Sequence, residues 1–275
     1  MKEKVSVIIA TYNNENTIAK AIDSILNQTY DNWECVICDD ASSDGTKDVI
    51  CGYKEKYGEK IIYIENINNC GPAYSRNRCI DIARGEYIAI QDADDISLPE
   101  RLDKQVKFLN ENKDISAVGT YAVLINDKGE EWGINKPLCF PIKENWVKGP
   151  QVIHASTMIR KKDLLDVGKY NENLRRVEDY HLWLKMILKG YNIATIPEIL
   201  YKIHLNEASY RRRSFKYRWD EAITIYHAIK EMHVPFIYYC YFLKPLINGI
   251  IPNKLIYLYH KQKFGKHNKI VKFKN

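Results

Sequence analysis

Short apolar runs alternate with amphipathic segments through the first 110 residues. The apolar runs are rich in β-branched residues and predict buried strands at 5–10, 33–38, 61–64 and 86–91. A segment with helical spacing follows each run, as with Ile18, Ile22 and Ile25 after the first. Four strand–helix repeats predict an α/β fold with a parallel, doubly wound sheet.

Helix boundaries are also marked in this half of the chain. Gly85 stands where the third helix is expected to end, before the fourth strand. Ser97 and Glu100 have the Ser-x-x-Glu spacing of a capping box, with Leu102 and Val106 on one face behind it. The fourth helix is therefore expected to begin directly after the fourth strand.

The pattern changes after residue 110. Longer β-like runs occupy 115–125 and 151–159, and a short helix is expected at 163–167. A stronger helix opens at Glu178 and stops before Gly190, and short strands are expected on either side of Pro197. These features predict one domain over residues 1–204, with halves at 1–110 and 111–204.

Residues 205–275 differ from this body in charge and composition. Arg211, Arg212 and Arg213 precede a helix whose predicted apolar side carries Trp219, Ile223, Tyr226 and Ile229, and a Tyr-rich apolar stretch follows at 235–243. Neither apolar piece reaches the roughly 18–20 residues that span a bilayer. Tyr-rich segments edged with Lys are typical of a membrane interface.

The net charge of +6 is unevenly distributed. Residues 202–275 contain 15 Lys and Arg against 4 Asp and Glu, a net +11, which leaves −5 for residues 1–201. A basic, aromatic tail on a mildly acidic body predicts an anionic partner for the tail. Phospholipid and nucleic acid are both candidates.

Length, cysteine content and the N-terminus narrow the class further. A chain of 275 residues is long enough to bury a sizeable core. Cys35 and Cys38 form a CxxC within a predicted strand, where their side chains point to opposite faces, and no second pair completes a zinc set. The start, Met1 to Lys4, leads into a strand without a cleavage pattern. We therefore expect reduced, buried cysteines and a cytoplasmic location.

Three carboxylates follow the fourth strand directly, at Asp92, Asp94 and Asp95. The carboxyl edge of an open α/β sheet is where ligands bind, and acids crowded there repel one another unless a divalent cation lies between them. No Gly-x-Gly-x-x-Gly or Lys-bearing Gly-rich loop follows the first strand. The stretch predicts a metal–diphosphate site rather than a dinucleotide site.

Five blocks together resemble the motif series of family 2 glycosyltransferases. They lie in order at 5–14, 39–46, 75–77, 85–95 and 178–183, and the resemblance covers about residues 4–205. It implies a GT-A fold, a Rossmann-like mixed sheet flanked by helices, with a C-terminal helical extension. It also implies an inverting hexosyltransferase of bacterial glycan biosynthesis.

The resemblance implies a nucleotide site at the first two strand ends. Ala10, Thr11 and Tyr12 would line it, Tyr12 would stack on the base, and Asp40, with Asp39 as its neighbour, would accept a hydrogen bond from uracil. Loop packing for Tyr12 and helix capping for the two acids are the structural alternatives. Arg76 and Asn77 would face the nucleotide or its diphosphate, unless they lie on a solvated helix face.

By the same resemblance, Asp92-x-Asp94 corresponds to the DxD motif. Asp94 would bind Mn²⁺ or Mg²⁺ that bridges the phosphates, and His204 is a further candidate ligand. Asp92 and Ala93 would contact the nucleotide. Asp95 is expected to hold the turn.

Glu178 and Asp179 resemble the family's catalytic acid pair. Asp179 would be the general base that removes the acceptor proton, with Glu178 in support. Stabilisation of the helix N-terminus is the structural alternative. Trp183, one turn later, would stack on an acceptor sugar or else pack in the core. His154 is a weaker candidate for the diphosphate.

The sequence therefore predicts transfer of one sugar from a UDP-sugar to a growing, lipid-linked glycan such as capsule, O-antigen or exopolysaccharide. The tail would hold the enzyme peripherally at the inner face of the membrane, and nucleic acid is not expected as a partner. Processive synthases carry Gln-x-x-Arg-Trp, whereas Phe215 precedes Arg218 and Trp219 here. The alternatives are a sugar nucleotidyltransferase and a non-catalytic nucleotide-sugar-binding subunit.

Overall fold

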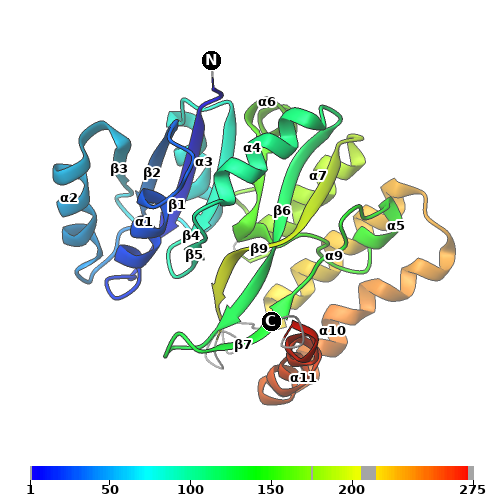
Figure 1. The fold of residues 1–275 in the computed structure, drawn as a ribbon. Coiled ribbons are helices and arrows are strands. Elements are labelled where there is room, and N and C mark those ends of the chain that lie inside the picture. Colours follow the sequence, from blue (N-terminus) through cyan, green and yellow to red (C-terminus); the bar gives the residue numbers. More distant parts are fainter. Residues whose placement is uncertain (1, 175, 206–214, 272–275) are drawn as a thin grey trace.

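A computed structural model describes residues 2–174, 176–205 and 215–271, and its strands form one mixed sheet with helices on both faces (Figure 1). The predicted fold class is confirmed. The strands are β1 (Val5–Thr11), β2 (Trp33–Asp39), β3 (Ile61–Glu65), β4 (Tyr87–Asp92), β5 (Ile96–Ser97), β6 (Ile115–Ile125), β7 (Glu131–Asn135), β8 (Met158–Arg160) and β9 (Asn192–His204). The α-helices are α1 (Ile18–Leu26), α2 (Thr46–Tyr57), α3 (Pro72–Ile82), α4 (Arg101–Glu111), α5 (Lys143–Trp146), α6 (Lys161–Asp166), α7 (Glu178–Leu188), α9 (Phe215–Met232), α10 (Leu243–Ile250) and α11 (Asn253–Val271). Short 3-10 helices are η1 (Gly58–Lys60), η2 (His154–Ser156) and η3 (Phe236–Phe242).

Strand register brings the predicted site residues to one edge of the sheet. The order is β3-β2-β1-β4-β8-β6-β9-β5, with β7 beside β6, and the first four strands are parallel. Thr11 pairs with Asp39 across β1 and β2, and Ala10 pairs with Asp92 across β1 and β4. Parallel strands end at the same edge, so three separate motifs of the sequence meet there.

Two apolar clusters cover the two faces of the sheet. Ile8, Val36 and Cys38 pack with residues of α3, α7 and α9, whereas Val7, Cys35 and Ile37 pack with residues of α1 and α4. Alternation of side chains along a strand separates the two sets. Cys35 and Cys38 therefore lie on opposite faces, as their spacing predicts, and both are free thiols.

The second half of the sheet departs from the prediction in two places. Residues 151–159 were expected to form a strand, but only β8 at the end of this stretch does so, and η2 precedes it. The strands expected around Pro197 are a single strand, β9, whose pairing with β6 shifts register at Thr120 and Tyr121. The register shifts accommodate Pro197, which has no backbone N–H group to donate to the neighbouring strand.

The capping box predicted at Ser97 is wrong. Helix α4 begins later, at Arg101, and its N-cap residue Glu100 makes no side-chain capping hydrogen bond. The Ser97 hydroxyl instead donates to Gln91 Oε1 (2.7 Å) and accepts a hydrogen bond from Arg101 (2.8 Å). Ser97 thus ties the end of β4 to α4.

The predicted boundary at residue 204 does not separate two cores. Helix α9 places Ile225, Ala228 and Ile229 in the same apolar cluster as α3 and α7. Its buried side differs from the predicted one, because Trp219 is 52% exposed and Ile223 and Tyr226 are also exposed. Ile225 and Ala228 are buried in their place, and of the predicted residues only Ile229 is buried. Arg211, Arg212 and Arg213 lie outside the described residues.

Helix α11 lies along β7, the strand that pairs with β6 outside the main strand order (Figure 1). Within the described parts of the chain, no helix combines the length and apolar character needed to cross a bilayer.

One buried cation anchors the end of β4. Arg101 is fully buried, donates to the carbonyl oxygen of Ile90 (2.7 Å) and lies over the ring of Tyr201. Burial lowers the pKa of Arg101 to about 10. Its contacts fix the strand that delivers the acids of the DxD stretch.

We predict that Arg101→Met lowers the free energy of unfolding by about 3–5 kcal/mol, because its buried acceptors would lose their donor. Urea unfolding measures this loss. Lys104→Met, about one turn later on the same helix, removes only solvent-screened ion pairs to Glu100 and Glu198 and should change stability far less. Equal effects of the two substitutions would contradict the anchoring role of Arg101.

Candidate functional site

A cavity of about 510 Å³ opens at the carboxyl edge of the sheet. Its lining comes from the turn after β4, the start of α7, the end of β9 and helix α9. The lining residues are Asp92, Asp94, Asp95, Pro150, Arg176, Val177, Asp179, Tyr180, Ile203, His204, Leu205, Tyr217, Arg218 and Glu221. The predicted metal and base residues therefore share one cavity.

Asp95 holds the turn of the DxD stretch. It is 4% exposed and accepts a hydrogen bond from the backbone N–H of His204 (2.8 Å). Burial, and after it the charges of Asp92 and Asp94, raise the pKa of Asp95 well above its usual value. The same hydrogen bond joins the end of β9 to this turn.

Arg76 joins the two acidic motifs. Its guanidinium group donates to Glu178 Oε1 (2.8 Å) and to Asp92 Oδ1 (3.2 Å), and it lies 5.7 Å from the ring centre of Tyr170. Burial lowers the pKa of Arg76, but the charges of Asp92 and Glu178 outweigh this effect and raise it. Arg76 therefore remains a cation and places Glu178, next to Asp179, against the DxD stretch.

Asp179, the predicted general base, lies in a setting that raises its pKa. Its carboxylate accepts a hydrogen bond from the backbone N–H of Tyr180 (2.6 Å) and lines the cavity. Burial, followed by the charge of Glu178, raises the pKa of Asp179 to about 7. A carboxylate with this pKa accepts a proton far more readily than an ordinary aspartate.

The acid cluster is suited to a divalent cation without forming a complete protein cage. Asp92, Asp94 and Asp95 crowd negative charge at the cavity, and carboxylate oxygens suit Mg²⁺ and Mn²⁺. Among the described residues, no three His, Cys, Asp or Glu side chains form a ready metal-binding group. Mg²⁺ commonly takes one or two carboxylates and completes its shell with substrate phosphates and water, so the residues fit a cation that arrives with a diphosphate.

His204 contributes to the site in a different way from that predicted. Its Nε2 lies 2.8 Å from Asp127 Oδ1, while its backbone N–H binds Asp95. The side chain lines the cavity but is already paired through this nitrogen. Its role as a metal ligand stays a prediction.

The predicted nucleotide residues surround the ends of β1 and β2. Tyr12 is 48% exposed, whereas Thr11, Asp39 and Asp40 are buried. Asp39 accepts hydrogen bonds from the Ser42 amide and hydroxyl groups. Tyr12 thus has a ring available for stacking, and its role stays a prediction.

Asp40 fixes the loop that leads into α3. Its two carboxylate oxygens accept hydrogen bonds from the backbone N–H groups of Cys70 (2.9 Å) and Gly71 (2.8 Å), and from Asn66 (2.6 Å). Each oxygen has further acceptor capacity. These contacts give Asp40 a structural role, and the predicted hydrogen bond to uracil remains untested.

Two predicted site residues point elsewhere in this structure. The Asn77 amide is 4% exposed and binds the backbone of Tyr170 and the side chain of Glu172. The Trp183 ring is fully buried and packs near His154, so it has no free face for an acceptor sugar. The core-packing alternative describes Trp183, and these contacts do not favour a nucleotide role for Asn77.

His154 belongs to the interior rather than to the diphosphate edge. Its Nε2 lies 2.9 Å from the hydroxyl oxygen of Tyr170. Burial, and after it the charge of Arg76, lower the pKa of His154 well below its usual value. His154 is therefore a neutral packing partner of the Arg76 region.

Several residues that line the cavity are not predicted from the sequence. Arg176 and Val177 precede the acid pair, and Tyr217, Arg218 and Glu221 come from α9. Only the pairing of Arg218 with Trp219 was available as a signal, and it concerned a different class of enzyme. Helix α9 enters the site because it packs on α7, a contact that no local pattern encodes.

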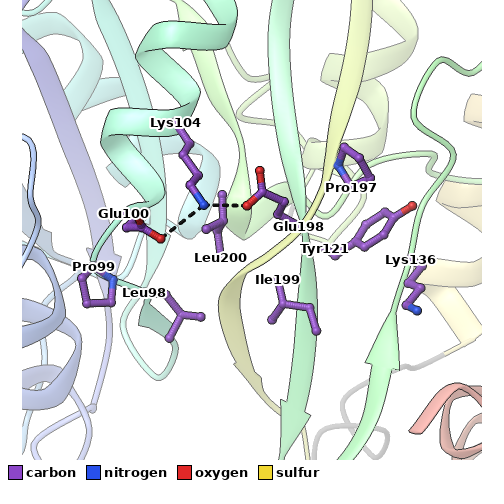
Figure 2. Close-up of a pocket in the computed structure, with 10 residues that line it drawn as sticks. All are labelled: Leu98, Pro99, Glu100, Lys104, Tyr121, Lys136, Pro197, Glu198, Ile199 and Leu200. Carbon is purple, nitrogen blue, oxygen red and sulfur yellow. Dashed lines mark hydrogen bonds and ion pairs between the residues drawn. The ribbon is translucent and has the colours of Figure 1, made fainter. Parts of the chain in front are cut away.

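A second pocket, of about 560 Å³, lies between α4 and β9 and contains none of the predicted site residues (Figure 2). Lys104 reaches between Glu100 and Glu198 there, and Tyr121 and Lys136 line the other side. Its volume is similar, but its two carboxylates, Glu100 and Glu198, are both paired with Lys104. The acidic cavity is the better candidate for chemistry.

Comparison with protein families matches residues 6–168 to the model described as Glycosyl transferase family 2. The chain is 39% identical over 265 residues to the putative glycosyltransferase EpsE of Bacillus subtilis, covering 94% of each chain. It is 32% identical over 223 residues to WfgD of Escherichia coli, named a UDP-Glc:alpha-D-GlcNAc-diphosphoundecaprenol beta-1,3-glucosyltransferase, covering 78% of this chain and 84% of WfgD.

Among solved structures, the fold is similar to that of Staphylococcus aureus TarS 1-349 in complex with UDP-GlcNAc. The TM-score is 0.68 at 21% identity, over 90% of this chain and 71% of the TarS chain. This likeness supports the fold independently of the sequence matches.

We predict that Asp179→Asn abolishes sugar transfer while UDP affinity stays within about twofold, because the amide cannot accept the acceptor proton and the nucleotide residues lie at other strand ends. In the wild type, kcat/KM should fall about tenfold per pH unit below the Asp179 pKa of about 7. UDP release against pH and calorimetric UDP binding measure the two effects. Lost UDP affinity in the variant would place Asp179 in the donor site.

Thermal unfolding checks the raised pKa of Asp179 without an activity assay. Because the folded-state pKa is raised, the stability linked to this group is fully present below its unfolded-state pKa of about 4 and lost as the pH rises through about 7. Asp179→Asn should therefore gain stability over the wild type at pH 8, and the gain should shrink as the pH falls. A gain that does not vary with pH would contradict the assignment.

Proposed function

The chain belongs to the family 2 glycosyltransferases, and we propose that it transfers one sugar from a UDP-sugar to a hydroxyl group of a growing, lipid-linked glycan. The observation that carries this proposal is Asp179, with its pKa of about 7, in one cavity with Asp92 and Asp94. A base beside an acidic, cation-suited edge is what inverting transfer from a nucleoside diphosphate requires.

The names of similar proteins and the position of Tyr12 support a uridine donor. WfgD is named for UDP-Glc, and a TarS structure holds UDP-GlcNAc. In this chain the half-exposed Tyr12 ring lies at the end of β1, beside the DxD end of β4. The uridine would stack there, and its diphosphate would extend toward Asp92 and Asp94.

The residues of the cavity divide the reaction between them. Asp179 takes the proton of the acceptor hydroxyl group as that oxygen bonds to the sugar C1, while the bond from C1 to the diphosphate oxygen breaks. Attack from the face opposite the leaving group inverts the anomeric carbon, so a covalent enzyme intermediate is not needed. Arg76 and Glu178 hold Asp179 at the DxD stretch during this step.

A divalent cation, Mn²⁺ or Mg²⁺, would be held by Asp94 together with the donor phosphates, with Asp92 in support and His204 as a further candidate. When bound, it supplies Lewis-acid stabilisation of the departing UDP. The protein's own part is to hold the carboxylates at the strand edge, which it does through Arg101 and the hydrogen bond from His204 to Asp95.

The C-terminal tail would hold the enzyme at an anionic membrane surface on the cytoplasmic side. Its exposed apolar side chains among the described residues lie in η3, α10 and α11 and in the link between the last two helices, and they are Phe236, Ile237, Leu243, Ile247, Ile250, Ile251, Leu255, Leu258 and Tyr259. Lys244, Lys254 and Lys261 lie in the same segment. Apolar side chains beside lysines fit the boundary between acyl chains and anionic headgroups. A membrane location would bring the active site to a lipid-linked acceptor.

We predict that Asp94→Ala abolishes transfer and weakens UDP binding when Mn²⁺ is present, because the cation loses its protein ligand. Calorimetry with UDP, with and without Mn²⁺, and a UDP-release assay measure both effects. Glu100→Ala, an acid outside the cavity, serves as the control. Full activity of Asp94→Ala would refute the metal assignment.

We predict that the wild type floats with phosphatidylglycerol vesicles and that Ile247→Asp with Ile250→Asp reduces binding at least about tenfold, because each buried isoleucine contributes about 1.5–3 kcal/mol. Leu165→Asp, in α6, replaces a similarly exposed leucine outside the tail and should leave flotation unchanged. Retention on DNA without flotation would favour the nucleic-acid alternative.

A further inference from the structure

The cavity is lined by acidic residues on one part of its wall and by arginines on another. Asp92, Asp94 and Asp179 line one part of it, whereas Arg176 and Arg218 come from the segment before α7 and from α9. Arg176 lies 5.8 Å from the ring centre of Tyr217, another lining residue. The mechanism described above uses neither arginine.

Arg218 is a buried donor with unused hydrogen-bonding capacity. The residue is 6% exposed, and its Nη1 donates to Glu221 Oε2 (3.1 Å). Its Nε has no hydrogen-bond partner among the described residues. A buried guanidinium N–H group without an acceptor is costly, and a ligand that enters the cavity can supply one.

The chemistry of this side favours phosphate. Arginine presents its N–H groups in a planar fork that matches the oxygens of a phosphate group, and such charge-assisted hydrogen bonds are strong in a part-buried cavity. Glu221 occupies the Nη1 side of the Arg218 fork, and the Nε side is buried without an acceptor among the described residues. Arg176 adds a second positive charge on the same wall.

The position of the arginines assigns this phosphate to the acceptor rather than to the donor. The predicted nucleotide residues lie at the ends of β1 and β2, whereas α9 packs on α7, and α7 contacts β9 in the other half of the strand order. In an acceptor whose sugar is joined directly to a lipid diphosphate, the phosphates lie within one sugar of the reacting hydroxyl group. Asp179 and Arg218 line the same cavity of about 510 Å³, which suits this short separation.

We propose that Arg218, assisted by Arg176, binds the diphosphate of a lipid-linked acceptor and thereby selects the first sugar on the lipid carrier. This inference rests on the proposed function and narrows its acceptor to a sugar diphospho-lipid. It also gives α9 a direct part in substrate selection.

Binding to the protein saturated with UDP and Mn²⁺ tests this inference. The probes are N-acetylglucosaminyl diphosphate on a geranyl chain and decyl N-acetylglucosaminide, which has no phosphate. Arg218→Gln should weaken binding of the diphosphate probe about tenfold or more and that of the phosphate-free probe by less than about twofold. Arg218→Lys should fall between Arg218→Gln and the wild type, because it keeps the charge but not the fork.

Arg176→Gln, at an exposed position, repeats the test if Arg218→Gln does not fold, and it should reduce the preference for the diphosphate probe in the same direction. Lys189→Gln, which removes a surface ion pair with Asp166 outside the cavity, is the charge-matched control. Equal weakening of both probes, or equal wild-type affinity for them, would overturn the inference. Weaker UDP affinity in the arginine variants would assign them to the donor.

A separate UDP-release assay on the wild type and on the arginine variants keeps the two proposals apart. Transfer to the probes with no dependence on the arginines would leave the proposed function intact and remove this subsite. Arginine-dependent probe binding without transfer from any UDP-sugar would do the reverse.

Discussion

The structure depends on neutralising a concentration of carboxylates at one edge of its sheet. The DxD stretch and the acid pair at the start of α7 bring five acids toward one cavity, and ionised carboxylates in a part-buried site repel one another strongly. Two buried arginines answer this charge. Arg101 lies beneath the end of β4, and Arg76 spans Asp92 and Glu178. Neither arginine adds much net stability together with its neighbouring acids. Removing an arginine, however, would leave buried charge or buried acceptors without compensation.

The same balance of acids and arginines contributes to the pKa of Asp179. Glu178 and Asp92 raise the pKa of Asp179, whereas Arg76 lowers it, and burial has the largest effect. Because Arg76 takes its hydrogen bonds to Glu178 and Asp92, the carboxylate of Asp179 stays available to accept a proton. An ion pair between residues 102 positions apart thus fixes the acid pair of α7 relative to the DxD stretch. In this sense Arg76 is a positioning residue for two motifs at once.

Local patterns in the sequence predict part of this site. Strands that end on acids, and parallel strands that end together, were sufficient to place Asp92 with Ala10 and Thr11 with Asp39. Local patterns do not predict the contacts between residues that are distant in the sequence. Ser97 fits a capping box in sequence but binds Gln91 and Arg101, and Trp183 is adjacent to the acid pair in sequence but turned into the core. The buried side of α9 was misjudged because tertiary packing on α7, rather than helical spacing, selects it.

Helix α9 shows why a boundary in composition is not a boundary in function. The charge change near residue 204 separates a mildly acidic body from a basic tail, yet α9 buries Ile225 and Ile229 with the body and lines the cavity with Tyr217, Arg218 and Glu221. The sheet edge carries the residues that the proposed function assigns to the donor, whereas α9, which follows the sheet in the chain, carries the residues that we assign to the acceptor. One cavity thus carries acids on one side and arginines on the other. In the reaction that we propose, the acids would hold a cation that arrives with the donor and the arginines would bind the anionic acceptor, so the polarity of the cavity would orient the two substrates.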